Sequence, residues 1–450
     1  MANLNRTRLG RPPEKTHAEK SSQGPLAAPM LPLAMAPDPP RRAFRAGPFG
    51  VLDVGSTKVC CMIGRVDPDG TLRVAGFGMI ASRGVRLGSI VDIEDAERAI
   101  RKAVADAEEM AQHRLRAVTV NLGCGQPASR MVNVQWPVGG RPVTEADIRR
   151  VLAEARARAQ HEGRDTVHVV PLAFDVDETQ GAADPRGLHC DHLTARLHTV
   201  DASSTALRNL VTAIERCELD VAELVSAPLA AGLSTLVEDE RQLGATVIDM
   251  GGGTTDLAVF NEGQVIHTAQ VALGGNHVTH DVARLLSTPV AHAEWLKTLY
   301  GNAQGSPDDE REMLPIQLVG EEEHQLHRVP RSQVVAIIRP RLEETFEMVR
   351  EKLDRAGLAR ESGRVVLTGG ASQLVGAREM AAHILDRQVR LGRPTTLRGL
   401  ADHDGPAFAT AAGLLAWSTG AGRPLSDIEV GDDAPPGLVR RFINFVRERI

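Results

Sequence analysis

The chain has 450 residues, of which 42% are hydrophobic, and a formal net charge of −6 at pH 7. That length allows two to four subdomains with a substantial core. The negative charge argues against a general nucleic-acid binder, and with only nine Phe, three Trp and one Tyr the chain is poor in side chains on which bases stack. Its five cysteines form no CxxC pair, which indicates reduced cytosolic thiols. We therefore expect a globular protein with no nucleic-acid partner.

The first 47 residues are rich in Pro, Ala and Arg and lack periodicity, which predicts a disordered basic tail. Within it, Pro25–Pro37 follows basic residues as the core of a signal peptide would. Its four prolines would break the helix that such a core forms. No stretch of the chain approaches the roughly 18 continuous apolar residues of a membrane span. We expect neither a secretion signal nor a spanning helix.

Order is predicted to begin near Pro48 and to alternate strands with helices, which indicates an α/β protein. Strands are predicted at Phe49–Val54, Val59–Val66, Leu72–Met79, Ala117–Leu122, Val167–Val176, Leu193–Val200, Val221–Leu224, Ala245–Met250, Leu257–Asn261 and Arg364–Leu367. Helices are predicted at Ile93–Gln112, Thr144–Gln160, Ser203–Cys217, Pro228–Leu236, Gln333–Leu353 and Phe408–Trp417. Pro340 should kink the long helix that contains it.

Two segments, DVGSTK at Asp53–Lys58 and VIDMGGGTTD at Val247–Asp256, resemble each other. Each predicts a strand that feeds a tight turn without bulky side chains, so backbone N–H groups and hydroxyls can approach a polyphosphate. Facing each other across a cleft, they would clamp a nucleotide. The residues expected to contact its phosphates are Gly55, Ser56, Thr57, Lys58, Gly251, Gly252, Gly253, Thr254 and Thr255. Lys58 could instead be a solvated surface lysine.

Asp53 and Asp249 stand where the two strands meet their turns, and Asp256 closes the second motif. Carboxylates beside a triphosphate repel it unless a cation intervenes. We expect these three to hold Mg²⁺, mostly through water, since Mg²⁺ keeps much of its hydration shell. The alternative is that each Asp only forms its turn.

A third glycine turn lies in VVLTGGAS at Val365–Ser372. Gly369, Gly370 and Ala371 would let a base or ribose lie against the backbone. Arg341 and Glu344, on the long predicted helix, could close that pocket. They could equally belong to a solvated helix face.

The last residues, GLVRRFINFVRERI at Gly437–Ile450, follow a polar linker at 418–436. On a helical wheel, an arc of about 160° holds Leu438, Val439, Phe442, Ile443, Phe445, Val446 and Ile450. Arg440 and Arg447 lie on the opposite, polar face, which suits anionic lipid. We expect a helix that lies on a membrane surface; the alternative is a helix that docks on the protein body.

The order of phosphate turn, small-residue helix, second phosphate turn, TGGAS turn and small-residue helix is similar to that of the actin-like ATPase superfamily. Within it, the chain closely resembles the FtsA family of bacterial cell-division proteins. The segments that carry this resemblance are SRGVRLGSIVDIE at Ser82–Glu94, HVVP at His168–Pro171, APLAAG at Ala227–Gly232, VEDERQLGATVIDMGGGTTD at Val237–Asp256 and LTGGASQLVG at Leu367–Gly376.

The resemblance covers roughly Phe49–Ile450 and implies an α/β, actin-like (ribonuclease H-like) two-lobed ATPase fold with an FtsA-type inserted subdomain and a C-terminal amphipathic helix. The disordered N-terminal tail, predicted from its composition, falls outside it. The resemblance implies a first lobe core at 48–123, the inserted subdomain at 124–201, a second lobe core at 202–274, its small subdomain at 275–340, the remaining core and return helix at 341–417, the linker at 418–436 and the membrane helix at 437–450.

The resemblance also implies a function. The chain would bind ATP and Mg²⁺, polymerise with itself, and tether the FtsZ ring to the cytoplasmic face of the inner membrane at the division site. It would also help to recruit later division proteins. The small subdomain at 275–340 would receive the C-terminal tail of FtsZ. The alternatives are an actin-like adaptor for pilus assembly and a sugar-kinase-type phosphotransferase.

One departure concerns Ala227, which precedes Pro228. Relatives in the superfamily often place a Glu there, which orients the attacking water. A carboxylate or amide is the group needed to polarise water for phosphoryl transfer. We therefore expect tight nucleotide binding with slow hydrolysis, and we assign no catalytic residue.

Overall fold

The computed structural model describes residues 47–420, apart from 183, 323–324, 359–362, 396 and 400–401. These residues belong to one compact unit. The predicted tail up to residue 46 lies outside the described residues, as do most of the linker and the whole predicted membrane helix. Among the helices that the structure does describe, none is long and apolar enough to cross a membrane.

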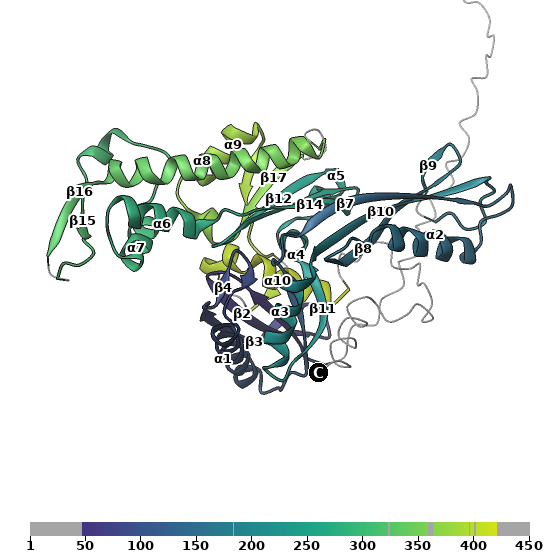
Figure 1. Ribbon diagram of the computed structural model, residues 1–450, viewed down its shortest axis with the longest axis horizontal. Helices are drawn as coiled ribbons and strands as arrows, with labels where there is room; N and C mark the ends of the chain where they lie inside the picture. The colour runs from purple at the N-terminus through teal and green to yellow at the C-terminus, as the bar shows by residue number, and fades with distance from the viewer. Residues whose placement is uncertain are drawn as a thin grey trace, which may run out of the picture. The chain divides into compact units, whose positions relative to one another are not determined.

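The first core sheet has the strand order β11-β6-β1-β2-β3-β19 (Figure 1). Its strands are β1 (Phe49–Val54), β2 (Lys58–Val66), β3 (Leu72–Ala81), β6 (Ala117–Leu122), β11 (Asp220–Ser226) and β19 (Leu397–Arg398). The short hairpin β4 (Val85–Arg86) and β5 (Ser89–Ile90) leads into α1 (Ile93–Ala111). Together α1 and α3 (Ser204–Glu215) cover one face of the sheet with buried apolar side chains.

From the sequence we expected the second lobe to begin near Ala202. The structure shows that it begins later in the chain. Strand β11 pairs in parallel with β6 of the first sheet. The apolar side chains Leu207, Leu210 and Ile214 of α3 belong to the core that also contains Ile100 of α1. Residues from 202 to 226 therefore complete the first lobe, and the predicted boundary is wrong because it ignored a pairing between strands far apart in the chain.

The second core sheet has the order β14-β13-β12-β17-β18. Its strands are β12 (Ala245–Met250), β13 (Thr255–Asn261), β14 (Gln264–Val271), β17 (Arg364–Thr368) and β18 (Val389–Leu391). One face is covered by α8 (Arg331–Arg355) and α9 (Ala377–Leu385). The other face packs on α4 (Ala227–Thr235) and α10 (Ala409–Ser418). The short helices are α5 (Glu238–Leu243), η2 (Gly370–Gln373) and η3 (Asp402–Phe408).

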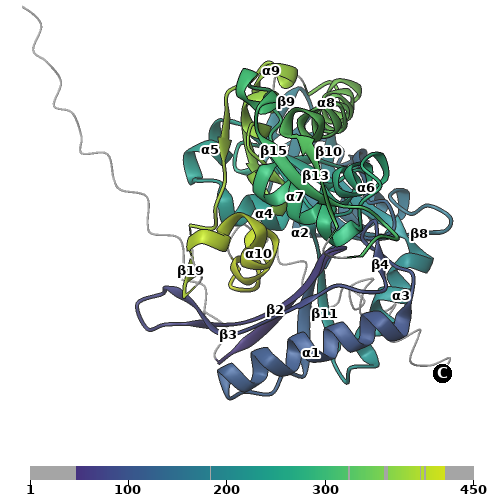
Figure 2. The same cartoon turned by 90° about the vertical axis from the view of Figure 1, so that its left-hand side faces the viewer.

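Helices α4 and α10 join the two sheets. One buried core contains side chains from both helices, from β1 and β2 of the first sheet, and from β12 and β13 of the second. Figure 2 shows α10 beside α4, with β2 and β3 below it. The backbones approach closely, since the Ser234 hydroxyl donates to the Ala409 carbonyl at 2.7 Å. Small residues are needed here because larger ones would separate the helices.

The inserted subdomain is a sheet of order β7-β10-β8-β9 with one helix on it. Its elements are β7 (Ala128–Pro137), α2 (Glu145–Arg158), β8 (Arg164–Val176), β9 (Thr179–Ala182) and β10 (His192–Ser203). Strands β7 and β9 were not predicted. The subdomain has its own apolar core, in which Ile148 and Leu152 of α2 pack on Leu193 and Leu197 of β10.

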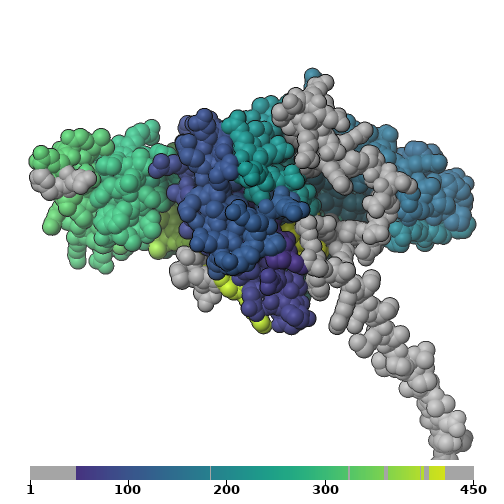
Figure 3. Space-filling view, turned by 90° about the horizontal axis from the view of Figure 1, so that it is seen from below, coloured from purple at the N-terminus to yellow at the C-terminus, as the bar shows by residue number. Residues whose placement is uncertain are grey.

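A second small subdomain belongs to the second lobe. It contains α6 (Gly275–Leu285), α7 (Val290–Tyr300), η1 (Pro307–Glu310), β15 (Met313–Gln317), β16 (Leu326–Pro330) and the first part of α8. Helix α8 is continuous through Pro340. In Figure 3 this subdomain, in green, and the inserted subdomain, in lighter blue, lie on opposite sides of the first lobe.

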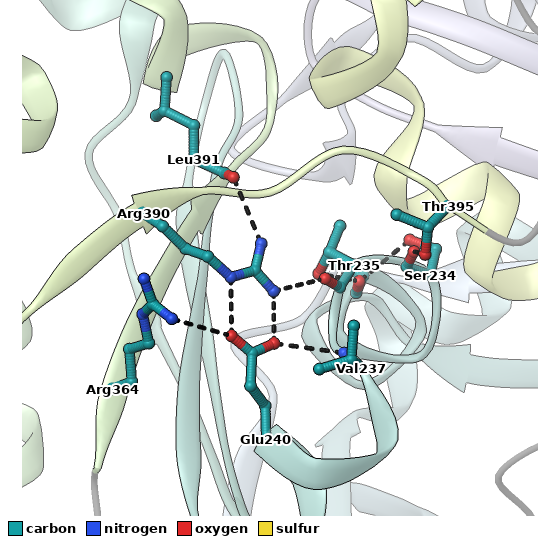
Figure 4. Close-up of polar contacts among 9 residues, drawn as sticks. Ser234, Thr235, Val237, Glu240, Arg364, Arg390, Leu391 and Thr395 are labelled. Atoms are coloured by element: carbon teal, nitrogen blue, oxygen red, sulfur yellow. Dashed lines mark hydrogen bonds and ion pairs between the residues drawn. The ribbon is translucent and has the colours of Figure 1, made fainter.

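An ion pair between Glu240 and Arg390 of β18 connects the end of α4 to the second sheet (Figure 4). The Glu240 carboxylate accepts from Arg390 Nε at 2.7 Å and also pairs with the Nη2 atom of Arg390. The same guanidinium donates to the Thr235 carbonyl at 2.8 Å. This bidentate pair holds the pKa of Glu240 below its ordinary value and so stabilises the joint in its charged form.

The contact between α4 and α10 predicts a strong effect of substitution at Gly413. An added Cβ there would lie 1.7 Å from the Ala230 carbonyl oxygen, which is backbone and cannot move aside. We expect Gly413→Ala to lower stability by about 2–3 kcal/mol, measured as a lower midpoint of denaturant unfolding. Gly305→Ala is the control, since its Cβ would meet nothing closer than 4.0 Å. Equal midpoints for the two variants would contradict the packing argument.

Candidate functional site

One open cavity between the two core sheets gathers most of the residues singled out from the sequence. The predicted residues that line it are Asp53, Gly55, Ser56, Thr57, Lys58, Asp249, Gly251, Gly252, Gly253, Thr254, Asp256, Gly369 and Gly370. The three glycine turns therefore meet at one site.

The first two turns are built alike. Each joins an antiparallel pair, β1 with β2 and β12 with β13. In the first, the Gly55 N–H donates to the Lys58 carbonyl at 3.0 Å; in the second, the Gly251 N–H donates to the Thr254 carbonyl at 2.9 Å. An Asp stands near the end of the leading strand in both cases. The same local sequence thus gives the same hairpin in each lobe.

The two turns touch, and only glycine fits at their contact. A Cβ at Gly252 would lie 1.8 Å from Thr57 Oγ1, and one at Gly253 would lie 2.4 Å from Ser56 Oγ. The hydroxyls of the first turn therefore face the bare backbone of the second. This close approach leaves hydroxyl and N–H groups as the donors nearest to any ligand between the turns.

Helix α6 begins directly beside the second turn. The N–H groups of Gly275 and Asn276 donate to the carbonyls of Gly251 and Gly252 at 2.9 and 2.8 Å. The partial positive charge at the N-terminus of this helix favours an anion nearby. Helix α6 was not predicted from the sequence.

The three carboxylates share this site. Asp53 and Asp256 are buried and Asp249 is partly buried. Burial raises the pKa of Asp53 to about 6, an effect that Lys58 opposes and Asp249 enhances. Burial also raises the pKa of Asp249 and brings that of Asp256 to about 7. These carboxyl groups are destabilised in their charged form, which a bound cation would relieve.

Hydrogen bonds fix two of these carboxylates. The Thr410 hydroxyl donates to Asp249 at 2.6 Å, and the Thr254 hydroxyl donates to Asp256 at 2.8 Å. In the described part of the chain, no group of three or more His, Cys, Asp or Glu side chains is placed to hold a metal ion directly. Carboxylate oxygens are donors that Mg²⁺ prefers, and Mg²⁺ commonly reaches them through its own water ligands.

Lys58 lies on the cavity wall. Its ammonium donates to the carbonyl of Ala407 and lies 5.1 Å from the centre of the Phe408 ring. The side chain is partly buried, so it differs from the solvated lysine that we considered as an alternative. Its charge faces the carboxylate side of the cavity and lowers the pKa of Asp53.

Four predicted residues do not line this cavity. Arg341 donates to Asp281 at 2.6 Å and pairs with Glu344. Arg341 and Glu344 line a separate groove between α6 and α8, and their closing of the pocket at the third turn stays a prediction. The Thr255 hydroxyl is buried and donates to the Leu273 carbonyl, because its position in β13 points it away from the turn. Ala371 likewise does not line the cavity.

Several lining residues were missed. They are Gly88, Asn121, Gly123, Pro406, Ala407, Ala409 and Thr410. Asn121 accepts from the Val54 N–H at 2.8 Å and so ties β6 to β1. Gly88 carried a signal because it lies inside the family-like segment Ser82–Glu94, and Ala409 and Thr410 carried one because they lie in the predicted small-residue helix Phe408–Trp417. Ala227, singled out for its position, also lines the cavity.

Two core sheets joined by crossing helices, with one glycine hairpin from each at a shared cavity, define an actin-like protein. Solved structures agree on this fold. The PilM-PilN type IV pilus biogenesis complex matches with a TM-score of 0.60 at 17% identity, covering 82% of this chain and 98% of that one. MreB5 of Spiroplasma citri bound to ADP matches with a TM-score of 0.52 at 14% identity, covering 86% and 99%.

Sequence comparison identifies the family. The model for cell division protein FtsA matches residues 246–413, and the model for the SHS2 domain inserted in FtsA matches residues 124–201. FtsA of Agrobacterium fabrum is 41% identical over 87% of this chain and 90% of the relative. FtsA of Escherichia coli K12 is 34% identical over 81% and 88%. This chain belongs to the FtsA family of cell division proteins, and the predicted actin-like fold with its inserted subdomain is confirmed.

The raised pKa of Asp53 predicts how stability depends on pH without ligand. Its pKa is about 6 in the folded protein against an ordinary value of 3.8, so its contribution to stability is present below pH 4 and is lost as pH rises through 6. The loss amounts to up to roughly 3 kcal/mol. Asp53→Asn cannot ionise, so its stability relative to wild type should rise between pH 4.5 and 7.5, measured by denaturant unfolding at each pH. A constant difference across that range would contradict the assignment.

Proposed function

We propose that the chain binds ATP with Mg²⁺ in the cavity between the two turns. The single observation that carries this proposal is that both glycine hairpins and three destabilised carboxylates line one cavity. The β- and γ-phosphates would lie against Gly55–Lys58 and Gly251–Thr254. Asp53, Asp249 and Asp256 would hold Mg²⁺ through its waters, and the ion would neutralise phosphate charge. The related fold of MreB5, described as bound to ADP, supports this assignment.

The third turn would receive the ribose and base. Gly369 and Gly370 line the same cavity as the phosphate turns, so a flat ring can lie against their backbone without meeting a side chain. Arg341 and Glu344 line the groove between α6 and α8, and they would close the base pocket from that side.

Hydrolysis would be slow. Ala227 lines the cavity at a position where a carboxylate would be needed to orient water. The amide of Asn121 is already engaged with the backbone of β1. Nucleotide occupancy, rather than rapid turnover, would then set the state of the protein.

The cellular role that we propose is a membrane-tethering scaffold of the division ring. Self-assembled copies would link FtsZ to the cytoplasmic face of the inner membrane and recruit later division proteins. Family membership supports a role in division. The amphipathic segment Gly437–Ile450 supports the membrane contact, and many copies in a polymer would multiply its weak binding.

The FtsZ tail would dock on the small subdomain of the second lobe. Trp295 and Leu299 of α7, Met313 of β15 and Val319 expose apolar side chains there. The Trp295 and Tyr300 rings pack edge to face at 5.2 Å, which stiffens this surface. A short linear peptide gains most of its affinity from such a preformed apolar surface.

Two other functions are less well supported. A pilus-assembly adaptor shares the fold, as the PilM-PilN match shows, but that likeness extends to fold alone. A sugar-kinase-type phosphotransferase would need a catalytic Asp beside a polar substrate site, and the carboxylates of the described cavity are all accounted for by the proposed cation. Membership of a division family favours the scaffold over both.

ATP binding can be tested with an isosteric change. Asp249→Asn keeps the shape of the side chain but removes a charge from the proposed cation site. We expect affinity for a fluorescent ATP analogue to fall by at least about tenfold in Mg²⁺ and little in EDTA. Asp308→Asn removes one exposed charge from a residue that does not line the cavity and should leave the affinity unchanged. If Asp249→Asn binds as wild type does in Mg²⁺, the cation assignment is wrong.

The tether can be tested by sedimentation with anionic liposomes and FtsZ. The wild-type chain should bring FtsZ down with the vesicles. Phe442→Glu/Phe445→Glu removes apolar burial worth on the order of 1.5–3 kcal/mol for each ring, so it should leave both proteins in the supernatant. Replacing Arg440 and Arg447 with Gln should weaken binding on anionic vesicles only, more so at low salt. Recovery of the double-Glu protein with liposomes would place the anchor elsewhere.

A further inference from the structure

Gln270 makes two hydrogen bonds with a single nitrogen atom. It stands opposite Asp256 in the ladder between β13 and β14. Its Nε2 donates to Asp256 Oδ1 at 2.8 Å and to the Gly123 carbonyl at 3.0 Å. An amide nitrogen carries two hydrogens, so both are used. Because both partners are acceptors, the amide can only face them with its nitrogen.

Gly123 lies at the root of the inserted subdomain, which begins at residue 124. The strands that enter and leave the subdomain meet here, since the Ser203 N–H donates to the Gly125 carbonyl at 3.0 Å. A Cβ at Gly88 would lie 2.1 Å from the Gly123 carbonyl oxygen. The Gly88 N–H in turn donates to Ser56 Oγ at 2.9 Å. An unbroken series of contacts thus runs from Asp256 through the root to the first phosphate turn.

The same strand contacts the inserted subdomain a second time. The Thr268 N–H on β14 donates to Ser129 Oγ of β7 at 3.1 Å, and that hydroxyl is 2.6 Å from His198 Nε2 of β10. Figure 1 shows β14 beside β7 and β10. The inserted subdomain is therefore connected through the backbone to the first lobe and hydrogen-bonded to a strand of the second. If the two lobes moved relative to each other, the subdomain would have to move as well or these hydrogen bonds would break.

We propose that Gln270 is a positioning residue that couples occupancy of the cleft to the placement of the inserted subdomain. The proposal rests on the proposed ATP site. Asp256 would hold a hydrated cation through its carboxylate, and if that carboxylate shifted toward the bound ion, the amide that donates to its Oδ1 would follow it. Because the other hydrogen of the amide is bound to the Gly123 carbonyl, that shift would reach the root of the subdomain. Thr254 still holds the other oxygen of Asp256, so Gln270 is dispensable for the carboxylate to stay in the site.

The test uses the full chain and two readouts, affinity for a fluorescent ATP analogue and hydrogen exchange of residues 124–203 with and without Mg-ATP. In the wild type, Mg-ATP should change exchange in that segment. Gln270→Met keeps the length of the side chain but has no donor. It should bind ATP no more than about tenfold more weakly, yet Mg-ATP should no longer change exchange in 124–203. Gln264→Met on the same strand is the matched control, because Oε1 of Gln264 has no partner, and it should behave as wild type.

The outcomes separate this inference from the proposed function. If the wild type fails to bind ATP, both the proposed ATP site and the proposed coupling are wrong. If Gln270→Met binds ATP and keeps the wild-type difference in exchange, only the coupling is overturned, even if exchange is uniformly faster because the variant is less stable. Gln270→Asn, whose amide is one methylene too short to reach both acceptors, should repeat the loss and serves if the Met variant does not fold.

Discussion

The burial of three carboxylates at the meeting of two lobes is the constraint on which the rest of the structure depends. Asp53 comes from the first sheet, and Asp249 and Asp256 come from the second. Burial and mutual repulsion destabilise their charged forms. Such an arrangement costs stability unless protons or a cation compensate. The cation and nucleotide that we propose for this cleft would therefore stabilise the folded chain.

The helices around the carboxylates hold the two lobes close together, so that carboxylates from both lobes line one cavity. Small residues let α4 and α10 cross in close contact beneath both sheets. Thr410 on α10 donates to Asp249, and Ala227 at the start of α4 lines the same cavity. A hydrogen bond thus connects one carboxylate to a helix that joins the lobes. Gln270 connects another, Asp256, to the Gly123 carbonyl at the root of the inserted subdomain.

Much of the fold could be predicted because its signals are local. Strands β1, β6 and β12 have the predicted bounds, since each is a buried apolar run that ends at a polar turn. The glycine hairpins were found for the same reason. Strand β7 was missed because most of its side chains are at least partly exposed and its alternation is weak. The local sequence pattern therefore predicts buried strands and tight turns, but it does not reveal a strand such as β7, whose side chains are mostly exposed in part.

The failures share one physical cause, which is that they depend on contacts between distant parts of the chain. Strand β11 belongs to the first lobe because it pairs with β6, and nothing within its own residues specifies that partner. Arg341 pairs with Asp281 on α6, a contact that the residues around Arg341 do not specify. Thr410 and Asn121 enter the site only because the folded chain brings η3, α10 and β6 to it.

The most direct test of this account is a crystal structure of the chain with ATP and Mn²⁺ in place of Mg²⁺, with the cation located by its anomalous scattering. The account predicts one Mn²⁺ between the carboxylates of Asp53, Asp249 and Asp256, with water molecules between them and the ion and the phosphates against both glycine turns. A cation or nucleotide bound outside this cavity, for example in the groove beside Arg341, would contradict it.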